Sequence, residues 1–179
     1  LFSIAQWLVC GFTINCPESG DTVMTDLREI GPTYYFAPPR VFENLLTQVM
    51  IRMEDAGALK RRAFHYFMDV ARRCGAEVLD GKPGIALADR LLYAIGNVLI
   101  YGPLRNVLGM SRIRVAYTAG AAIGPDLFRF YRSIGINMKQ LYGATETCAY
   151  VCLQPDGDIK LDSVGKPAPG VEVKIAENG

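Results

Sequence analysis

The sequence predicts an α/β fold in which helices flank a partly parallel sheet. The first observation is a strand–helix–strand unit, in which two β-rich segments, 113–118 and 136–141, enclose a segment with helical spacing. Units of this kind are almost always parallel and right-handed. The second observation is the stretch 40–109, where apolar residues recur every three or four positions, as in helices. The third is a strand-like segment, 171–175, ahead of an Asn-Gly pair, which predicts the start of a C-terminal β-hairpin.

The N-terminal third is expected to hold two helices and two strands. Residues 1–10 are apolar and predict a buried helix, and residues 10–16 are β-rich. Residues 22–30 predict a second helix with Asp21 as its cap. The aromatic segment 34–37 predicts a short buried strand, which a Pro-Pro pair ends.

The stretch 40–109 predicts three main helices. The first carries a stripe of apolar residues that we expect to be buried: Val41, Phe42, Leu45, Leu46, Val49, Met50 and Met53. A second helix at 59–74 places five side chains on one face: Leu59, Ala63, Phe67, Val70 and Cys74. Asp89 opens the third helix, which Pro103 is expected to break. A separate cap over the sheet is one arrangement open to these helices.

The helix inside the strand–helix–strand unit has clear end signals. Pro125 suits the first helical position, and Asp126 places a negative charge near the positive end of the helix dipole. Gly135 supplies the C-terminal stop. Between them, four apolar residues have helical spacing: Leu127, Phe130, Tyr131 and Ile134.

The end of the second strand combines groups that suit a nucleotide carried with a metal ion. Tyr142 offers a ring that can stack on a base, and the small residues Gly143 and Ala144 leave room for backbone groups to approach a ligand. Thr145 can hydrogen-bond a phosphate oxygen, and Glu146 is a hard oxygen ligand for magnesium. Spacing alone leaves a plain strand-to-loop transition with a solvated Glu146 equally open.

A small-residue loop, 118–122 (Thr-Ala-Gly-Ala-Ala), leaves the first strand of the same unit. In open α/β sheets, ligands bind where the carboxyl ends of parallel strands meet. If the two strands are neighbours, we expect Gly120, Ala121 and Ala122 to form one wall of a flat slot and Tyr142 the other.

Composition and charge narrow the function classes. A chain of 179 residues that is 50% hydrophobic suits one domain or subdomain rather than a disordered segment. The formal net charge of +1 gives no argument for nucleic acid, so we expect no nucleic-acid partner. Five cysteines without a regular framework predict reduced thiols and a cytoplasmic protein. Cys148 and Cys152 are expected to be core thiols rather than a metal pair, and His65, the only histidine, has no nucleophile signature nearby.

Three motifs give the chain a resemblance to a known family. They are the loop 118–122, the segment 142–146 (Tyr-Gly-Ala-Thr-Glu) and the segment 164–167 (Val-Gly-Lys-Pro). Together they resemble the adenylate-forming, or AMP-binding, superfamily. The closest branch looks like the long-chain fatty acyl-CoA synthetases, because residues 31–33 (Gly-Pro-Thr) and 38–41 (Pro-Pro-Arg-Val) are similar to the part of that branch that precedes a long helical insertion.

The resemblance implies a ligase reaction in two steps. A fatty acid carboxylate attacks the α-phosphate of ATP to give an acyl-adenylate and pyrophosphate, and coenzyme A then displaces AMP to give a thioester. The implied cofactors are ATP or AMP and Mg²⁺, with coenzyme A as a substrate. Thr145, at the α-phosphate, and Glu146, as the magnesium ligand, are the implied catalytic residues. Tyr142 would stack on adenine, and the implied nucleotide-binding residues are Gly120, Ala121, Ala122, Tyr142, Gly143, Ala144 and Thr145.

The resemblance also implies a domain organisation. Residues 1–179 would be an internal fragment of the large AMP-binding N-terminal domain, with 40–109 as its helical insertion. The family's phosphate loop, rich in glycine and serine or threonine, and its C-terminal domain with a catalytic lysine are absent from this sequence. We therefore expect the isolated chain to be inactive, and missing neighbours make its self-association an expectation.

Other functions stay open at this point. One is an adenylating enzyme for another carboxylic acid, and another is a nucleotide-binding module without catalysis. A further open question concerns the basic residues of segment 59–74, which suit either peripheral contact with an anionic membrane or a simple solvated helix face.

Overall fold

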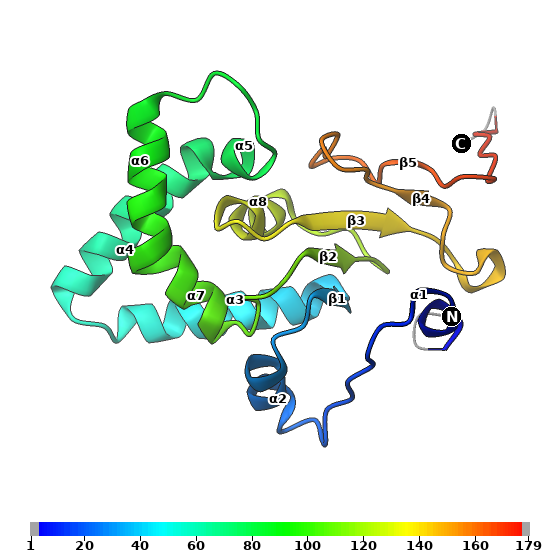
Figure 1. Cartoon of the computed structure of the whole chain (residues 1–179), viewed down its shortest axis with the longest axis horizontal. Coiled ribbons are helices and arrows are strands. Elements are labelled where there is room, and N and C mark those ends of the chain that lie inside the picture. The colour runs from blue at the N-terminus through cyan, green and yellow to red at the C-terminus, as the bar shows by residue number, and fades with distance from the viewer. Residues whose placement is uncertain (1–3, 177–179) are drawn as a thin grey trace.

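The computed structural model describes residues 4–176 of the chain. It has an α/β fold with a mixed, partly parallel open sheet and flanking helices, which confirms the predicted fold class (Figure 1). The strands lie in the order of the sequence: β1 (Tyr34–Ala37), β2 (Val115–Thr118), β3 (Met138–Tyr142), β4 (Cys152–Leu153) and β5 (Lys166–Pro167). Strands β1, β2 and β3 are parallel, whereas β4 and β5 add antiparallel pairs at the far edge.

The helices gather mainly at one end of the sheet (Figure 1). The α-helices are α1 (Ala5–Cys10), α2 (Val23–Ile30), α3 (Pro39–Glu54), α4 (Ala58–Val70), α5 (Ala76–Leu79), α6 (Leu87–Gly96), α7 (Gly102–Val107) and α8 (Pro125–Ser133). Two π-helical segments, Ala71–Gly75 and Asn97–Tyr101, follow α4 and α6, and a 3₁₀ turn spans Thr145–Thr147.

One face of the sheet packs on α3 and α8. Phe42 of α3 is fully buried between the rings of Tyr35 and Tyr131, with ring centroids 5.8 and 5.2 Å away. The Tyr131 hydroxyl donates a hydrogen bond of 2.7 Å to the Phe42 carbonyl, so the two helices are joined by a polar contact as well. Ala116 and Met138, from β2 and β3, lie in the same core as buried side chains of α3, α4 and α7. The stretch 40–109 is therefore part of the main core and not a separate cap.

The strand–helix–strand unit agrees closely with its prediction. Helix α8 begins at Pro125, carries Asp126 in its first turn and buries Leu127 and Tyr131. Gly135, with φ of 86°, turns the chain directly after it. The register of β2 and β3 sets Thr118 opposite Gln140, so the two strands end at the same edge of the sheet.

Several predictions for the N-terminal third are wrong. Helix α1 forms, but none of its residues is buried. Residues 11–16 are not a strand, since Gly11 adopts a left-handed φ of 65° that ends α1 and turns the chain. At α2 the capping position is held by Thr22 rather than Asp21, and the Thr22 hydroxyl donates to the Asp26 carboxylate at 2.7 Å.

Two details of the helical stretch also differ from prediction. Leu59 is 85% exposed, because α4 packs through its C-terminal half, where Phe64, Met68 and Val70 are buried. Pro103 does not break the third helix. A π-helical segment precedes it, and the Gly102 N–H donates to the carbonyl of Asn97, five residues back. The wider π turn changes the hydrogen-bonding register and lets the helix continue through a residue that has no N–H of its own.

The expected C-terminal strand is not present at residues 171–175, which have no regular structure. A hairpin strand gains its hydrogen bonds only from a partner, and no second strand pairs with this segment within residues 4–176. The turn predicted at Asn178 and Gly179 lies outside the described residues.

Candidate nucleotide-binding site

The two predicted loops leave the same edge of the sheet. Strands β2 and β3 are hydrogen-bonded parallel neighbours, as the slot hypothesis requires. After β2, Gly120 has φ of 88° and open space where a Cβ would lie, and Ala121 and Ala122 are exposed. At the end of β3, Tyr142 is 56% exposed, so its ring is accessible for stacking. That the ring and the loop face one another across a slot stays a prediction.

The turn after β3 is closed by one hydroxyl. The Thr147 hydroxyl accepts a hydrogen bond from the Ala144 N–H at 3.1 Å and donates one to the Ala144 carbonyl at 3.0 Å. This contact folds the 3₁₀ turn on itself, and the side chains of Thr145 and Glu146 remain exposed. The backbone of Ala144 is thus committed to the turn, whereas the hydroxyl and carboxylate expected to meet phosphate and metal are accessible.

The missing side chain of Gly143 leaves room for the protein's own backbone rather than for a ligand. A Cβ at this position would lie 1.9 Å from the Ala149 carbonyl oxygen, so the space that we expected a ligand to use is taken by the protein backbone. Cys148 and Ala149 have φ of 53° and 69°, a left-handed conformation that is unfavourable for residues with a Cβ. The segment after Glu146 is therefore tightly turned and strained, at about 1 kcal/mol or more per residue.

Glu146 fits a magnesium ion that arrives with a nucleotide. Its carboxylate is exposed and makes no ion pair within the described part of the chain. No group of three or more His, Cys, Asp or Glu residues among residues 4–176 is arranged to hold a metal alone. Magnesium ordinarily binds one or two carboxylates together with substrate phosphates, so a single accessible carboxylate is a suitable donor.

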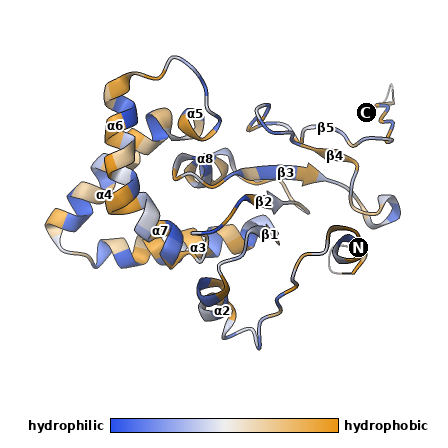
Figure 2. Cartoon of the chain, in the orientation of Figure 1, coloured by the Kyte–Doolittle hydropathy of each residue, from blue (hydrophilic) through white to orange (hydrophobic). Residues whose placement is uncertain are grey.

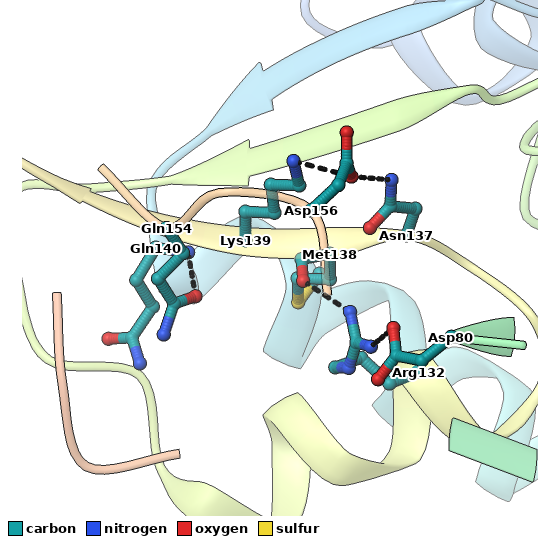
Figure 3. Close-up of polar contacts among 8 residues, drawn as sticks. All are labelled: Asp80, Arg132, Asn137, Met138, Lys139, Gln140, Gln154 and Asp156. Atoms are coloured by element: carbon teal, nitrogen blue, oxygen red, sulfur yellow. Dashed lines mark hydrogen bonds and ion pairs between the residues drawn. The ribbon is translucent and has the colours of Figure 1, made fainter. Parts of the chain in front are cut away.

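A buried amide pair supports the strand beneath the site. Gln154 is fully buried, and its Oε1 accepts a hydrogen bond of 2.8 Å from the Gln140 N–H (Figure 3). Its Nε2 donates to the Ser163 carbonyl at 2.7 Å, and Gln140 Nε2 donates to the Leu161 carbonyl at 3.2 Å. Gly165, with φ of 99°, has no room for a Cβ, which would lie 2.1 Å from the Leu153 carbonyl oxygen. The segment 160–167 is thereby fixed against β3 and β4.

Two ion pairs hold β3 and its neighbours in place (Figure 3). Lys139 is buried, and its Nζ lies 2.7 Å from the Asp156 carboxylate. Hydrogen bonds from Lys139 and Asn137 hold the pKa of Asp156 below its ordinary value. Arg132 is also buried, where it pairs with Asp80 at 2.6 Å and donates to the Met138 carbonyl at 3.1 Å. Both cations are buried and paired with a carboxylate, so they stabilise the fold and do not belong to the candidate site.

The sequence alone did not reveal two polar residues near this edge. One is Thr147, although a threonine hydroxyl is a known source of hydrogen bonds to backbone groups three residues away, as Ala144 is here. The other is Thr118, whose hydroxyl is buried at the carboxyl end of β2 and has no hydrogen-bond partner within residues 4–176.

The cysteines and cavities give no competing site at this edge. All five cysteines are free thiols. Cys152 is buried as expected, but Cys148 is exposed, because the left-handed turn places it outside the core. A cavity of about 120 Å³ lies elsewhere, between α2, α3 and the end of α7. Separately, no described helix is long and apolar enough to cross a membrane.

Comparison with known proteins identifies the family. The model of a family described as AMP-binding enzyme matches residues 1–179. The chain belongs to the AMP-binding enzyme family. This assignment agrees with the motifs at 118–122, 142–146 and 164–167 and with the parallel edge on which the first two lie.

Three curated relatives show what the chain is similar to. It is 34% identical over 148 residues to the long-chain-fatty-acid–CoA ligase FadD15 of Mycobacterium tuberculosis, a match that covers 83% of this chain and 24% of that ligase. It is 28% identical over 172 residues to the putative fatty-acid–CoA ligase fadD11 of the same species, covering 94% of this chain and 30% of the relative. It is 24% identical over 156 residues to the peroxisomal long chain acyl-CoA synthetase 7 of Arabidopsis thaliana, covering 87% and 21%.

The chain therefore spans about a quarter of the length of the curated relatives that it matches. No solved structure matches it.

Proposed function

We propose that this chain is part of an ATP-dependent long-chain fatty acid–CoA ligase. The observation that carries the proposal is the shared edge of β2 and β3, which presents the Gly120 loop and the exposed side chains of Tyr142, Thr145 and Glu146. The similarity to FadD15, which is named as a long-chain fatty-acid ligase, supports the choice of acid.

In the proposed reaction, Tyr142 and the backbone of Gly120–Ala122 bind adenine. The Thr145 hydroxyl donates to an α-phosphate oxygen while the fatty acid carboxylate attacks that phosphorus, and pyrophosphate leaves with the bonding electron pair. The thiol of coenzyme A then attacks the acyl carbon, and AMP leaves. Little covalent chemistry falls to the protein, so its contribution is to position the reactants and stabilise charge.

Magnesium would be held by Glu146 together with the phosphates, and when bound it supplies positive charge against them. The accessible carboxylate and the closed Thr147 turn support this role, because the turn fixes Glu146 on a strand end without occupying its oxygens.

We further propose that the chain lies within the AMP-binding domain of that ligase, with its helical stretch 40–109 as an insertion. The chain alone is then inactive, because it supplies the adenine wall, Thr145 and Glu146 without a glycine-rich phosphate loop or catalytic lysine. Incubation of the purified chain with ATP, magnesium, palmitate and coenzyme A tests this part: no acyl-CoA is expected, and detectable product contradicts it.

We propose that the full-length ligase is a cytoplasmic enzyme that contacts a membrane peripherally, because long-chain fatty acids partition into membranes. Self-association of the isolated chain stays a prediction. The exposed apolar side chains of α1 and of its N-cap residue support it, since contiguous apolar surface favours association: Ile4, Trp7, Leu8 and Val9.

Pyrophosphate release by the full-length parent tests the function. We expect release with palmitate to exceed that with acetate, benzoate or amino acids. Release only with another acid would keep the adenylating chemistry and discard the long-chain substrate. No release with any acid would favour a nucleotide-binding module without catalysis.

A further inference from the structure

Helix α6 and the π-helical segment after it carry an exposed apolar stripe. Five large side chains are exposed, at positions three or four apart or adjacent: Leu87 (83%), Leu91 (63%), Ile95 (41%), Val98 (73%) and Leu99 (58%). The only charged residues in this helix up to Tyr101 are Asp89 and Arg90. Figure 2 shows hydrophobic residues along α6, which lies at the end of the molecule away from the carboxyl ends of the parallel strands.

The helix that carries the stripe is firmly held from its other side. The Tyr93 hydroxyl donates to the Ser133 carbonyl at 2.9 Å, and the Tyr101 hydroxyl donates to the Phe67 carbonyl at 2.5 Å. Arg105 donates to the Ile134 carbonyl at 2.7 Å. Gly96 lies so close to Tyr101 that a Cβ would meet the Tyr101 hydroxyl at 2.7 Å. The helix that carries the stripe is thus packed in place, with the stripe exposed in the described chain.

Positive charge accompanies the stripe. Helix α4 packs on α6, and the segment from Ala58 to Gly75 carries five Lys or Arg residues against one Asp. Three of the arginines have acidic partners: Arg61 with Glu54, Arg72 with Asp69 and Arg73 with Asp89.

Four cations of α4, α6 and the loop between α5 and α6 have no acidic partner within residues 4–176. Lys60 and Arg62 are exposed on α4, Lys82 is exposed in the loop before α6, and Arg90 is exposed in the first turn of α6. The carboxylate of Asp89, the one acidic residue of α6, lies 3.4 Å from the Arg73 guanidinium and is therefore already in an ion pair.

We infer that the α6 stripe and the unpaired cations of α4, of α6 and of the loop before α6 form a peripheral docking face for an anionic lipid bilayer. A helix with an apolar face and basic flanks binds at the membrane interface, where the apolar side chains enter the headgroup boundary and the cations meet lipid phosphates. This inference deepens the peripheral contact proposed above and rests on it. It names the helix that enters the membrane and the lipid charge that it needs.

Charge argues for a lipid surface over a second copy of the chain. Two copies paired through their stripes would bring the basic flanks of both together, and like charges oppose such pairing. An anionic bilayer offers apolar lipid in which the stripe is buried and phosphate groups that attract the cations.

Vesicle co-sedimentation of the full-length protein tests the inference. Wild type is expected to pellet with vesicles of phosphatidylcholine and phosphatidylglycerol and to bind pure phosphatidylcholine at least about tenfold more weakly. The variant Leu87→Ser/Leu91→Ser is expected to lose about tenfold in binding to the mixed vesicles. The variant Lys60→Glu/Arg62→Glu is expected to lose at least as much on mixed vesicles and little on pure phosphatidylcholine.

Matched controls lie on the C-terminal segment. Val173→Ser/Ile175→Ser removes exposed apolar side chains, and Lys160→Glu/Lys174→Glu reverses exposed charges, so both are expected to bind like wild type. Pyrophosphate release with palmitate in the absence of vesicles is expected to be unchanged in every variant, which separates failure of the docking face from failure of the proposed enzyme.

Three outcomes would overturn the inference. The first is no vesicle binding by wild type, and the second is equal binding to both vesicle types. The third is a dimer in solution that the Leu87→Ser/Leu91→Ser variant abolishes while vesicle binding persists, which would make a second copy the partner of the stripe.

Discussion

At the helical end of the molecule, buried tyrosines direct their hydroxyls to backbone carbonyls, whereas at the carboxyl end of β3 the side chains of Tyr142, Thr145 and Glu146 are exposed. Tyr93 and Tyr131 each donate one buried hydrogen bond, and burial raises the pKa of Tyr93 to about 12. Thr145 and Glu146 are exposed, next to a backbone that turns through two left-handed residues. The buried aromatic core and the proposed nucleotide site thus lie at different ends of one sheet.

The largest expected effect is loss of the aromatic core. Phe42→Ala removes a fully buried ring between Tyr35 and Tyr131 and is expected to lower the free energy of unfolding by about 4 kcal/mol. Urea denaturation of the full-length protein measures it. A loss below about 1 kcal/mol would contradict the claim that the buried aromatic core at the helical end stabilises the fold.

The buried ion pair beneath β3 gives the next effect. Asp80→Asn leaves the Arg132 guanidinium buried without its counter-charge, at an expected loss of about 3 kcal/mol. Asp126→Asn is the matched control, since Asp126 is almost fully exposed and lies 3.5 Å from Arg129, and it is expected to change stability by less than about 1 kcal/mol. Equal losses in the two variants would contradict the assigned role of burial.

A substitution at Gly143 sharpens the comparison at the carboxyl edge of the sheet. Gly143→Ala forces the Ala149 carbonyl away, with an expected loss of about 2 kcal/mol and a displaced Thr145–Thr147 turn. Gly120→Ala has no such collision, and only its φ of 88° is unfavourable, so a loss of about 1 kcal/mol is expected. A larger loss at Gly120 than at Gly143 would mean that the close approach of the Ala149 carbonyl does not stabilise the turn.

The smallest effect concerns pH. The folded-state pKa of Asp156 is lowered, so its pairing with Lys139 contributes above the ordinary carboxylate pKa of about 4 and is lost as pH falls through the folded value. Because Asp156 is largely exposed, Asp156→Asn is expected to lower stability only slightly at pH 7 and not at all in strong acid. Urea titrations of both proteins from pH 7 to pH 3 check this, and a difference that grows toward low pH would have the wrong sign.

The strand–helix–strand unit was predictable because its signals are local. Pro125, the apolar spacing and Gly135 fix α8, and the parallel neighbours β2 and β3 follow from the short crossover. Strands β4 and β5 were not foreseen, because two-residue strands depend on distant pairings such as Leu153 with Lys166.

The residue types of the candidate site were predictable, but the local backbone geometry was not. The Tyr-Gly-Ala-Thr-Glu motif marks the right strand end, and the structure leaves Tyr142 and Glu146 exposed there. That Gly143 serves the Ala149 backbone, and that Thr147 closes the turn, depends on the path of the chain after Glu146, which residue types do not specify.

The most direct test of the account measures two properties of one variant, Glu146→Gln, in the full-length protein. We predict that its melting temperature equals that of wild type, because the carboxylate is exposed and unpaired among the described residues, while palmitate-dependent ATP–pyrophosphate exchange falls about 100-fold or more. Exchange within about twofold of wild type would contradict the assignment of this edge as the nucleotide site.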